Sequence, residues 1–170
     1  AHSPFAWRVD KENIEDRNQN SIVIQATFRE ADKDTRVIFG GDVDSDTLTE
    51  IVKTTKKHGN EDRLLWDVLK LFHHCSYKAL DQSSSEPEDK LDPVDEVKWL
   101  IETQGQEAGI IVSPSVAIPD EDTKGANPPH KRAADYYRKI MRKKDGEFKV
   151  TMMHPSQSAP KPLKVEIDWR

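Results

Sequence analysis

The sequence predicts an α/β domain whose mixed β-sheet carries helices on its outer face. Apolar segments of strand length alternate along the chain with amphipathic segments of helix length, at 21–28, 36–40, 47–58, 64–72, 93–104, 109–113 and 130–144. Strands that alternate with helices are typical of layered α/β folds. Helices on one side only leave the second face of the sheet apolar, so we expect a further layer or a partner chain to cover it.

Composition limits the function classes. The 170 residues suit a single domain, and hydrophobic and charged contents of 35% and 34% permit a modest core. A net charge of −5 argues against a protein that binds nucleic acid over its whole surface. One cysteine excludes an internal disulfide and fits a reducing compartment, so we expect a cytoplasmic protein. No apolar run approaches the roughly 18 residues of a membrane span, and we expect no membrane contact.

The first half of the chain is expected to form a β-hairpin followed by a helix. The segment 21–28 alternates in the manner of a strand, and a charged turn leads into the strand 36–40. The apolar face of the first strand, which we expect to be buried, consists of Ile22, Ile24, Ala26 and Phe28. Thr47 with Glu50 three residues later fits a capping box, so the helix is expected to begin at Thr47 and to end at Gly59.

The second half contains an insert, two helices and further strands. The stretch 82–92 is rich in Ser, Glu, Pro and Asp and predicts a mobile insert. Amphipathic helices are expected over 93–104 and 130–144, and alternating segments predict strands at 148–153 and 163–169.

Two short motifs stand at the ends of predicted strands, Gly41-Asp42 and His73-His74-Cys75-Ser76, and the strand that runs into the second reads Asp67-Val68-Leu69-Lys70. Together with the segments 20–24, 109–113 and 127–130, and in this order, they resemble the C-terminal half of a metallo-β-lactamase-fold hydrolase. Within that superfamily the chain is most similar to the hydrolase domains of ComEC-type DNA-uptake proteins and their soluble relatives. The resemblance implies that residues 1–170 are the C-terminal part of one metallo-β-lactamase-like domain, an αββα sandwich. It also places a strand in the second half of 64–72, where periodicity alone does not separate helix from strand.

The resemblance implies a two-zinc site, with Mn²⁺ as an alternative metal, for which Asp42, His73 and His74 are the ligands in this chain. Carboxylate and neutral imidazole are ordinary zinc ligands. Adjacent histidines on an extended segment point to opposite faces, so we expect one to bind metal and the other to contact substrate or a carboxylate. The residues alone also allow a simpler interpretation, in which Asp42 belongs to a turn or helix start and the histidines cap the next helix.

Two departures from the family pattern bear on this site. The family's first metal motif, H-x-H-x-D-H, is absent, so this chain alone is not expected to hold two metals. Cys75 stands where the family usually has glycine, either as a thiolate ligand or as a small half-buried residue. If the backbone requires a positive φ at Cys75, the residue would be strained there.

Ser76 and His130 are the candidate substrate-binding residues. Ser76 either caps the following helix or touches a substrate phosphate. His130 follows Pro128-Pro129 at the start of a helix, whose N-terminus and imidazole would hold a phosphate. The alternative for His130 is a surface histidine in the first turn. The basic residues of 130–144 would either follow a nucleic-acid backbone or form a solvated helix face.

These observations lead to a metal-dependent hydrolase directed at phosphodiesters or nucleic acid, in which the resemblance implies a metal-bound hydroxide as nucleophile. We expect the isolated chain to be inactive, because the missing motif would come from an N-terminal half or a partner chain. Two alternatives remain open. One is a non-catalytic interaction or regulatory module that retains the fold, and the other is a hydrolase of small esters or lactones on the same scaffold.

Overall fold

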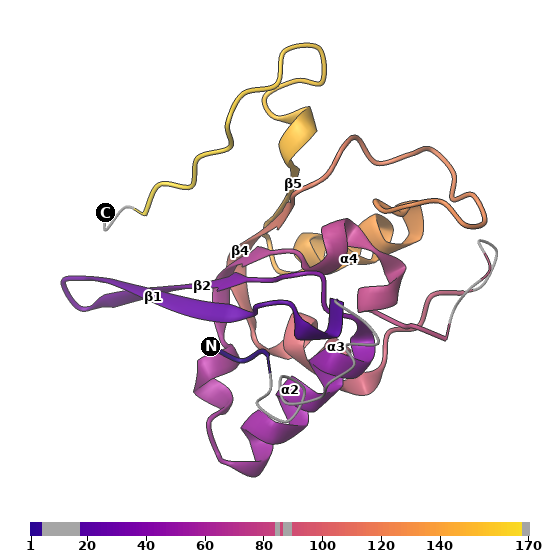
Figure 1. The fold of residues 1–170 in the computed structure, drawn as a ribbon. Helices are drawn as coiled ribbons and strands as arrows, with labels where there is room; N and C mark the ends of the chain where they lie inside the picture. Colours follow the sequence, from indigo (N-terminus) through magenta and orange to yellow (C-terminus); the bar gives the residue numbers. More distant parts are fainter. Residues whose placement is uncertain (5–17, 84–85, 87–89, 168–170) are drawn as a thin grey trace.

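The computed structural model describes residues 1–4, 18–83, 86 and 90–167, which form a five-stranded sheet in the order β1-β2-β3-β4-β5 (Figure 1). The strands are Ile24–Glu30 (β1), Lys33–Phe39 (β2), Trp66–Lys70 (β3), Gly105–Ser113 (β4) and Glu147–Val150 (β5). β1 pairs with β2 antiparallel, whereas β2, β3, β4 and β5 pair in parallel. The predicted α/β class with a mixed sheet is therefore confirmed.

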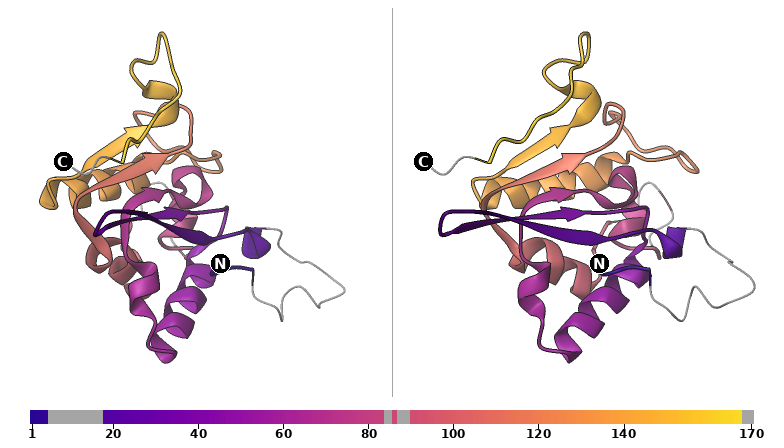
Figure 2. Two further views of the ribbon diagram at one scale, coloured as in Figure 1. Left: turned by 90° about the vertical axis from the view of Figure 1, so that its left-hand side faces the viewer. Right: turned by 60° about the vertical axis from the view of Figure 1, so that its left-hand side comes forward.

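One face of this sheet carries the helices (Figure 2). They are α2 (Ser45–Lys57), α3 (Asp95–Lys98) and α4 (Lys131–Lys143), and α3 continues into a π-helical turn over Trp99–Thr103. Each helix connects two neighbouring parallel strands, which explains why amphipathic segments separate the apolar ones along the sequence. No helix among the described residues has the length and apolar character that a membrane span requires.

The main core lies between the helices and the sheet. The central strands β2, β3 and β4 contribute Ile38, Leu69 and Ile111, which point toward the helices. The helices contribute apolar stripes that include Leu48, Ile51, Val52, Val97, Leu100, Ile101, Ala133, Ala134, Tyr137, Ile140 and Met141. This packing fixes the positions of the C-terminal ends of the central strands, and therefore of the residues that follow them.

The opposite side of the sheet faces away from the described helices. We call it the open face, and its side chains are Ile24, Ala26, Phe28, Val37, Phe39, Val68, Lys70, Ile110 and Val112. Phe28 and Phe39 are 48% and 42% exposed. The C-terminal segment 160–167 crosses this face as an extended chain, with Leu163 packed against the valines (Figure 2). The chain's own tail therefore covers the open face only in part.

The structure corrects the predicted face of the first strand. Val23 is buried, whereas Ile22 is 65% exposed and Ile24 and Phe28 lie on the open face. The alternation does indicate a strand. A period of two residues cannot show which of the two faces the helices will cover, and the helices pack on the other one.

Several element boundaries also differ from the predictions, and β4, for example, begins at Gly105 and not at Gly109. α2 begins at Ser45, because the carboxylate of Asp44 accepts the Thr47 N–H at 2.8 Å and caps the helix in place of Thr47. β5 ends at Val150 and is followed by a 3-10 turn. Residues 163–167 are extended but do not pair with the sheet, and 168–170 lie outside the described residues.

The predicted insert 82–92 falls partly outside the described residues, at 84–85 and 87–89. Several contacts attach its described part to the rest of the domain, including Lys98 Nζ at 2.7 Å from Asp92 Oδ1 and Lys124 Nζ at 2.8 Å from Glu86 Oε1. The N–H of Gln82 donates to the Ser45 hydroxyl at 3.0 Å. The guanidinium of Arg132 donates to the carbonyl oxygen of Glu86 at 2.6 Å. Mobility of the insert remains a prediction.

Candidate metal site

The C-terminal ends of β2 and β3 lie side by side at one edge of the sheet, because the two strands are parallel. β2 leads through Gly40 and Gly41 to Asp42, and β3 leads through Leu71 to the turn Phe72–Cys75. In α/β folds, ligands commonly bind beyond this edge of the sheet. The topology therefore brings the sequence-predicted ligands to one place.

Close packing requires both glycines before Asp42. A Cβ on Gly41 would lie 2.7 Å from the Cβ of Ser21, closer than real side chains approach. A Cβ on Gly40 would overlap the ring of Phe72. The glycines thus allow neighbouring segments of the chain to approach, and they fix the point at which Asp42 leaves the sheet.

The turn after β3 has an unusual backbone. His73, His74 and Cys75 have φ angles of 46°, 51° and 67°, in the left-handed region. This conformation costs a non-glycine residue about 1–2 kcal/mol, so surrounding contacts must hold it. The His73 N–H donates to the Gly41 carbonyl at 3.0 Å, and the His130 N–H donates to the Cys75 carbonyl at 3.1 Å. The expected extended conformation of the histidine pair is therefore wrong, and the strain marks the turn as a functional candidate.

Asp42 and His74 meet beside this turn. Asp42 Oδ1 lies 3.3 Å from His74 Nε2, and both side chains are partly exposed. The second ring nitrogen of His74, Nδ1, lies 2.8 Å from the Pro114 carbonyl oxygen. A carbonyl oxygen only accepts hydrogen bonds, so Nδ1 donates to Pro114, and if Nε2 carries no proton it presents its lone pair to Asp42. Two acceptor atoms then face each other, and a cation or a proton between them would stabilise the pair.

His73 is half-buried and lies near Asp42 and Asp44. Its Nδ1 atom is buried and has no hydrogen-bond partner among the described residues. Burial lowers the pKa of His73, and the negative charges of Asp42 and Asp44 oppose that shift. The structure thus pairs Asp42 with His74, while burial favours the neutral form of His73.

Cys75 is fully buried, and burial raises the pKa of its thiol to about 12 in spite of a hydrogen bond with Ser113. A thiolate is therefore disfavoured, which supports the interpretation of Cys75 as a small packing residue. Within the described residues, no group of three or more His, Cys, Asp or Glu side chains is arranged to hold a metal. Asp42 and His74 are two potential metal ligands that lie side by side.

A shallow groove of about 530 Å³ opens in front of this pair. Its polar wall contains Asp42, His74 and Lys70, and its apolar wall contains Ile24 and Phe39. The ammonium group of Lys70 donates to the Gly40 carbonyl at 2.5 Å. Burial lowers the pKa of Lys70, and the charge of Asp42 opposes this shift. Lys70 is the last residue of the Asp67–Lys70 motif and had no expected role in the site, although a lysine inside an apolar strand is a sequence signal for one.

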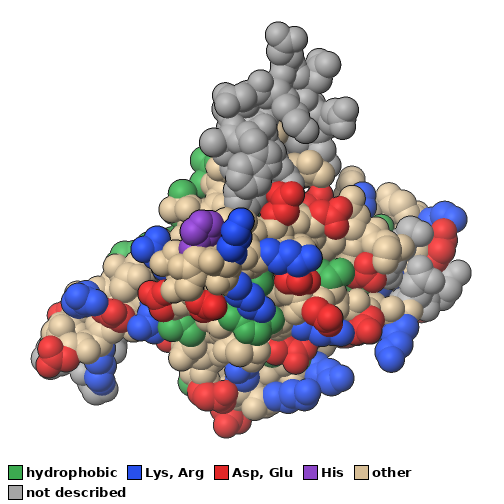
Figure 3. All heavy atoms as spheres, turned by 90° about the horizontal axis from the view of Figure 1, so that it is seen from below, with side chains coloured by type: hydrophobic (Ala, Val, Ile, Leu, Met, Phe, Trp, Pro, Cys, Tyr) green, Lys and Arg blue, Asp and Glu red, His purple; other side chains and the backbone are tan. Residues whose placement is uncertain are grey.

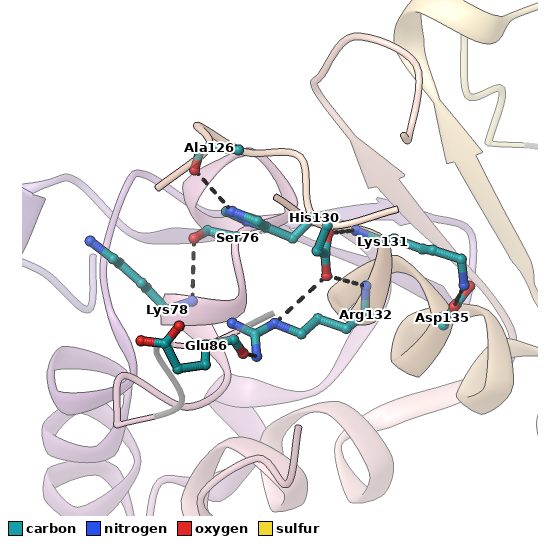
Figure 4. A network of polar contacts seen from close by, with 9 residues as sticks. Ser76, Lys78, Glu86, Ala126, His130, Lys131, Arg132 and Asp135 are labelled. Carbon is teal, nitrogen blue, oxygen red and sulfur yellow. Dashed lines mark hydrogen bonds and ion pairs between the residues drawn. The ribbon is translucent and has the colours of Figure 1, made fainter. Parts of the chain in front are cut away.

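Ser76 and His130 lie elsewhere (Figure 4). The hydroxyl of Ser76 is buried and accepts the Lys78 N–H at 3.2 Å, so it caps the short turn that follows. His130 is 5% exposed and is therefore not a surface histidine, and its imidazole donates from Nε2 to the Ala126 carbonyl at 3.1 Å. Burial lowers the pKa of His130. Neither residue lines the groove in front of Asp42.

The N-terminus of α4 already holds an anionic group. The carboxylate of Asp122 accepts the backbone N–H of Lys131 at 2.6 Å and that of Arg132 at 3.1 Å. A phosphate at this helix end, as considered from the sequence, would have to displace Asp122.

Several basic residues of α4 and its C-cap are engaged by nearby acids. Lys131 and Arg138 both pair with Asp135, and Lys144 lies 3.5 Å from Glu107. On the face of the molecule seen from below, basic and acidic side chains also interleave (Figure 3). These pairings favour a solvated helix face over a continuous nucleic-acid footprint.

Comparison with known proteins finds no protein-family model, no curated protein and no solved structure that matches this chain.

Proposed function

We propose that Asp42 and His74 bind a zinc or manganese ion, and that this chain supplies part of the centre of a metal-dependent hydrolase. The observation that carries the proposal is the 3.3 Å separation between Asp42 Oδ1 and His74 Nε2. Bonds of about 2.0–2.1 Å in a tetrahedral zinc site put neighbouring ligand atoms roughly 3.3 Å apart. A direct charge-assisted hydrogen bond would be shorter, at about 2.7–2.9 Å.

The orientation of His74 supports the same proposal. Histidines that bind metals ordinarily donate their other ring N–H to a carbonyl or carboxylate, which fixes the tautomer. The Pro114 carbonyl accepts that bond here, and the left-handed turn sets the direction of the ring. Backbone strain of this kind is commonly found where a side chain must be held in one position for function.

A bound metal would supply Lewis acidity and would lower the pKa of a water. Asp42 and His74 would hold the ion at the mouth of the groove, with further coordination positions left for other ligands and for substrate. A phosphodiester or nucleic-acid substrate is part of this proposal. It is supported by the resemblance to ComEC-type hydrolase domains and by the cationic Lys70 in the groove wall.

We further infer that a second apolar layer covers the open face in the active protein, either from an N-terminal half or from a partner chain. Phe28 and Phe39 are substantially exposed there, and the exposure of large apolar side chains to water is unfavourable. The groove borders this face at Ile24 and Phe39. A layer docked on the open face would therefore also reach the metal site and add the ligands that the two-metal arrangement lacks.

Calorimetric titration of the purified chain with zinc tests the proposal. We expect one ion to bind per Asp42–His74 pair, and Asp42→Ala and His74→Ala each to weaken binding at least about tenfold, since each removes one of two protein ligands. His154→Ala is the matched control, because His154 lies outside the groove. Zinc binding that is unchanged in both site variants would overturn the assignment.

A non-catalytic interaction module is the second candidate function, and the exposed open face favours it. In that case the chain would bind a partner through this face, and the Asp42–His74 contact would be an ion pair of the folded domain. Failure of the wild-type chain to bind zinc or manganese, together with partner binding that Phe39→Asp abolishes, would support this alternative.

A further inference from the structure

Lys70 occupies a position at which an apolar residue would be expected. It ends the central strand β3, and its side chain lies on the open face together with Val68, Phe39 and Val112. Removing an ammonium group from water has a free-energy cost that a leucine or methionine at the same position would not have. The charge of Asp42 favours the ammonium form but the apolar neighbours do not, so a cation at this position requires a further reason.

The contacts of Lys70 suggest that reason. Its ammonium group donates to the neutral carbonyl oxygen of Gly40 at 2.5 Å, and an ammonium has three donors. The side chain lines the groove that also holds Asp42 and His74. It equally borders an apolar cavity of about 360 Å³ that continues along the open face past Phe39. The cation thus stands where the polar groove and the apolar cavity join.

We propose that Lys70 is a substrate-binding residue that recognises a negative charge next to the Asp42–His74 pair. The groove would then select anionic esters such as phosphodiesters over neutral esters or lactones. The anionic group lies against Lys70, and an apolar or aromatic group of the same molecule packs on Ile24 and Phe39. This inference deepens the proposed function, on which it rests for the location of the site.

A structural role for Lys70 would have different consequences. The N–H of Gly40 also donates to the Lys70 carbonyl at 3.1 Å, so the side chain could serve only to tie Gly40 to β3. In that case Lys70→Met would destabilise the fold without a specific effect on anions. If Lys70 is a binding residue, Lys70→Met leaves the melting temperature unchanged but weakens anion binding, whereas Lys70→Arg retains anion binding.

The test is a titration of the full chain with two ligands in the presence of EDTA, monitored by two-dimensional NMR. The ligands are bis(4-nitrophenyl) phosphate, which is anionic, and its methyl triester, which is neutral and otherwise nearly identical. We expect the wild type to bind the diester more tightly than the triester, with shifts at residues of the groove. Lys70→Met should weaken diester binding at least about tenfold and leave triester binding unchanged, as for loss of a hydrogen bond to a charged group. Lys33→Met, on the exposed hairpin, is the matched control.

Asp42→Asn separates this inference from the proposed metal site. Without metal, the carboxylate of Asp42 repels an anion, so its neutral isostere should strengthen diester binding severalfold while weakening zinc binding. Loss of zinc binding therefore reports on the metal site, and diester binding in EDTA reports on Lys70. Absence of diester binding in the wild type, equal affinity for the two esters, or equal binding by Lys70→Met would each overturn the inference.

Discussion

Gly41 packs against Ser21 so closely that a Cβ on the glycine would lie 2.7 Å from the Cβ of Ser21. This contact places Asp42 where it faces His74. Gly41→Ala should therefore destabilise the domain by about 1–3 kcal/mol, as overpacking usually does. It should also weaken zinc binding, because Asp42 is displaced. Urea unfolding and zinc titration measure the two effects.

Gly125→Ala is the comparison for that variant. Gly125 has a φ of 73° and no atom near its missing side chain, so alanine is strained there without a clash. We expect a loss of about 1–2 kcal/mol with unchanged zinc affinity. Equal effects of the two variants on zinc affinity would show that the glycine contact does not position Asp42.

The left-handed turn makes a second prediction. Cys75 has a φ of 67° and is fully buried, so a β-branched residue of similar size would fit the space but not the backbone. Cys75→Val should destabilise the protein by about 1–3 kcal/mol more than Cys75→Ala. Denaturant titrations of both variants check this. If valine is tolerated as well as alanine, the turn is not left-handed in solution.

The cap of α2 provides a third prediction, because sequence and structure differ there. Asp44→Ala should cost about 0.5–2 kcal/mol, since the Thr47 N–H loses its acceptor, whereas Asp44→Ser should retain most of the stability. Asp46→Ala, in the exposed first turn, should cost only a few tenths of a kcal/mol through the helix dipole. A loss at Asp46 as large as that at Asp44 would contradict the observed cap.

A fourth prediction concerns activity. With saturating zinc or manganese, the isolated chain should not hydrolyse bis(4-nitrophenyl) phosphate, because the described residues bring together only two ligands. Release of 4-nitrophenol against a metal-only blank measures this. Metal-dependent turnover that Asp42→Ala abolishes would show that a complete centre exists in this chain, and that no added layer is needed.

Local patterns in the sequence were sufficient for much of the fold. The spacing of apolar residues and the positions of glycine and proline predicted the order of strands and helices. The two glycines after an apolar run predicted that Asp42 follows the end of a strand. The motif order also pointed to the histidine pair, and the structure brings His74 to Asp42.

Long-range packing decided what the sequence could not show. The covered face of β1 depends on where the helices pack, and Asp44 rather than Thr47 caps α2 because the chain turns earlier. A left-handed backbone at His73 and His74 is not the preference of these residues, so only contacts from distant segments reveal it. The place of Lys70 in the groove also depends on long-range pairing, because β2 and β3 bring it to the same groove as Asp42.

The most direct test of the proposed metal site is the state of the His74 ring. Long-range ¹H–¹⁵N correlation spectra distinguish the two nitrogens of each imidazole. Adding zinc should shift Nε2 of His74 toward the metal-bound range while Nδ1 remains protonated by its bond to Pro114, and His154 should stay unchanged. A His74 ring that is unaffected by saturating zinc, or that binds zinc through Nδ1, would contradict the account.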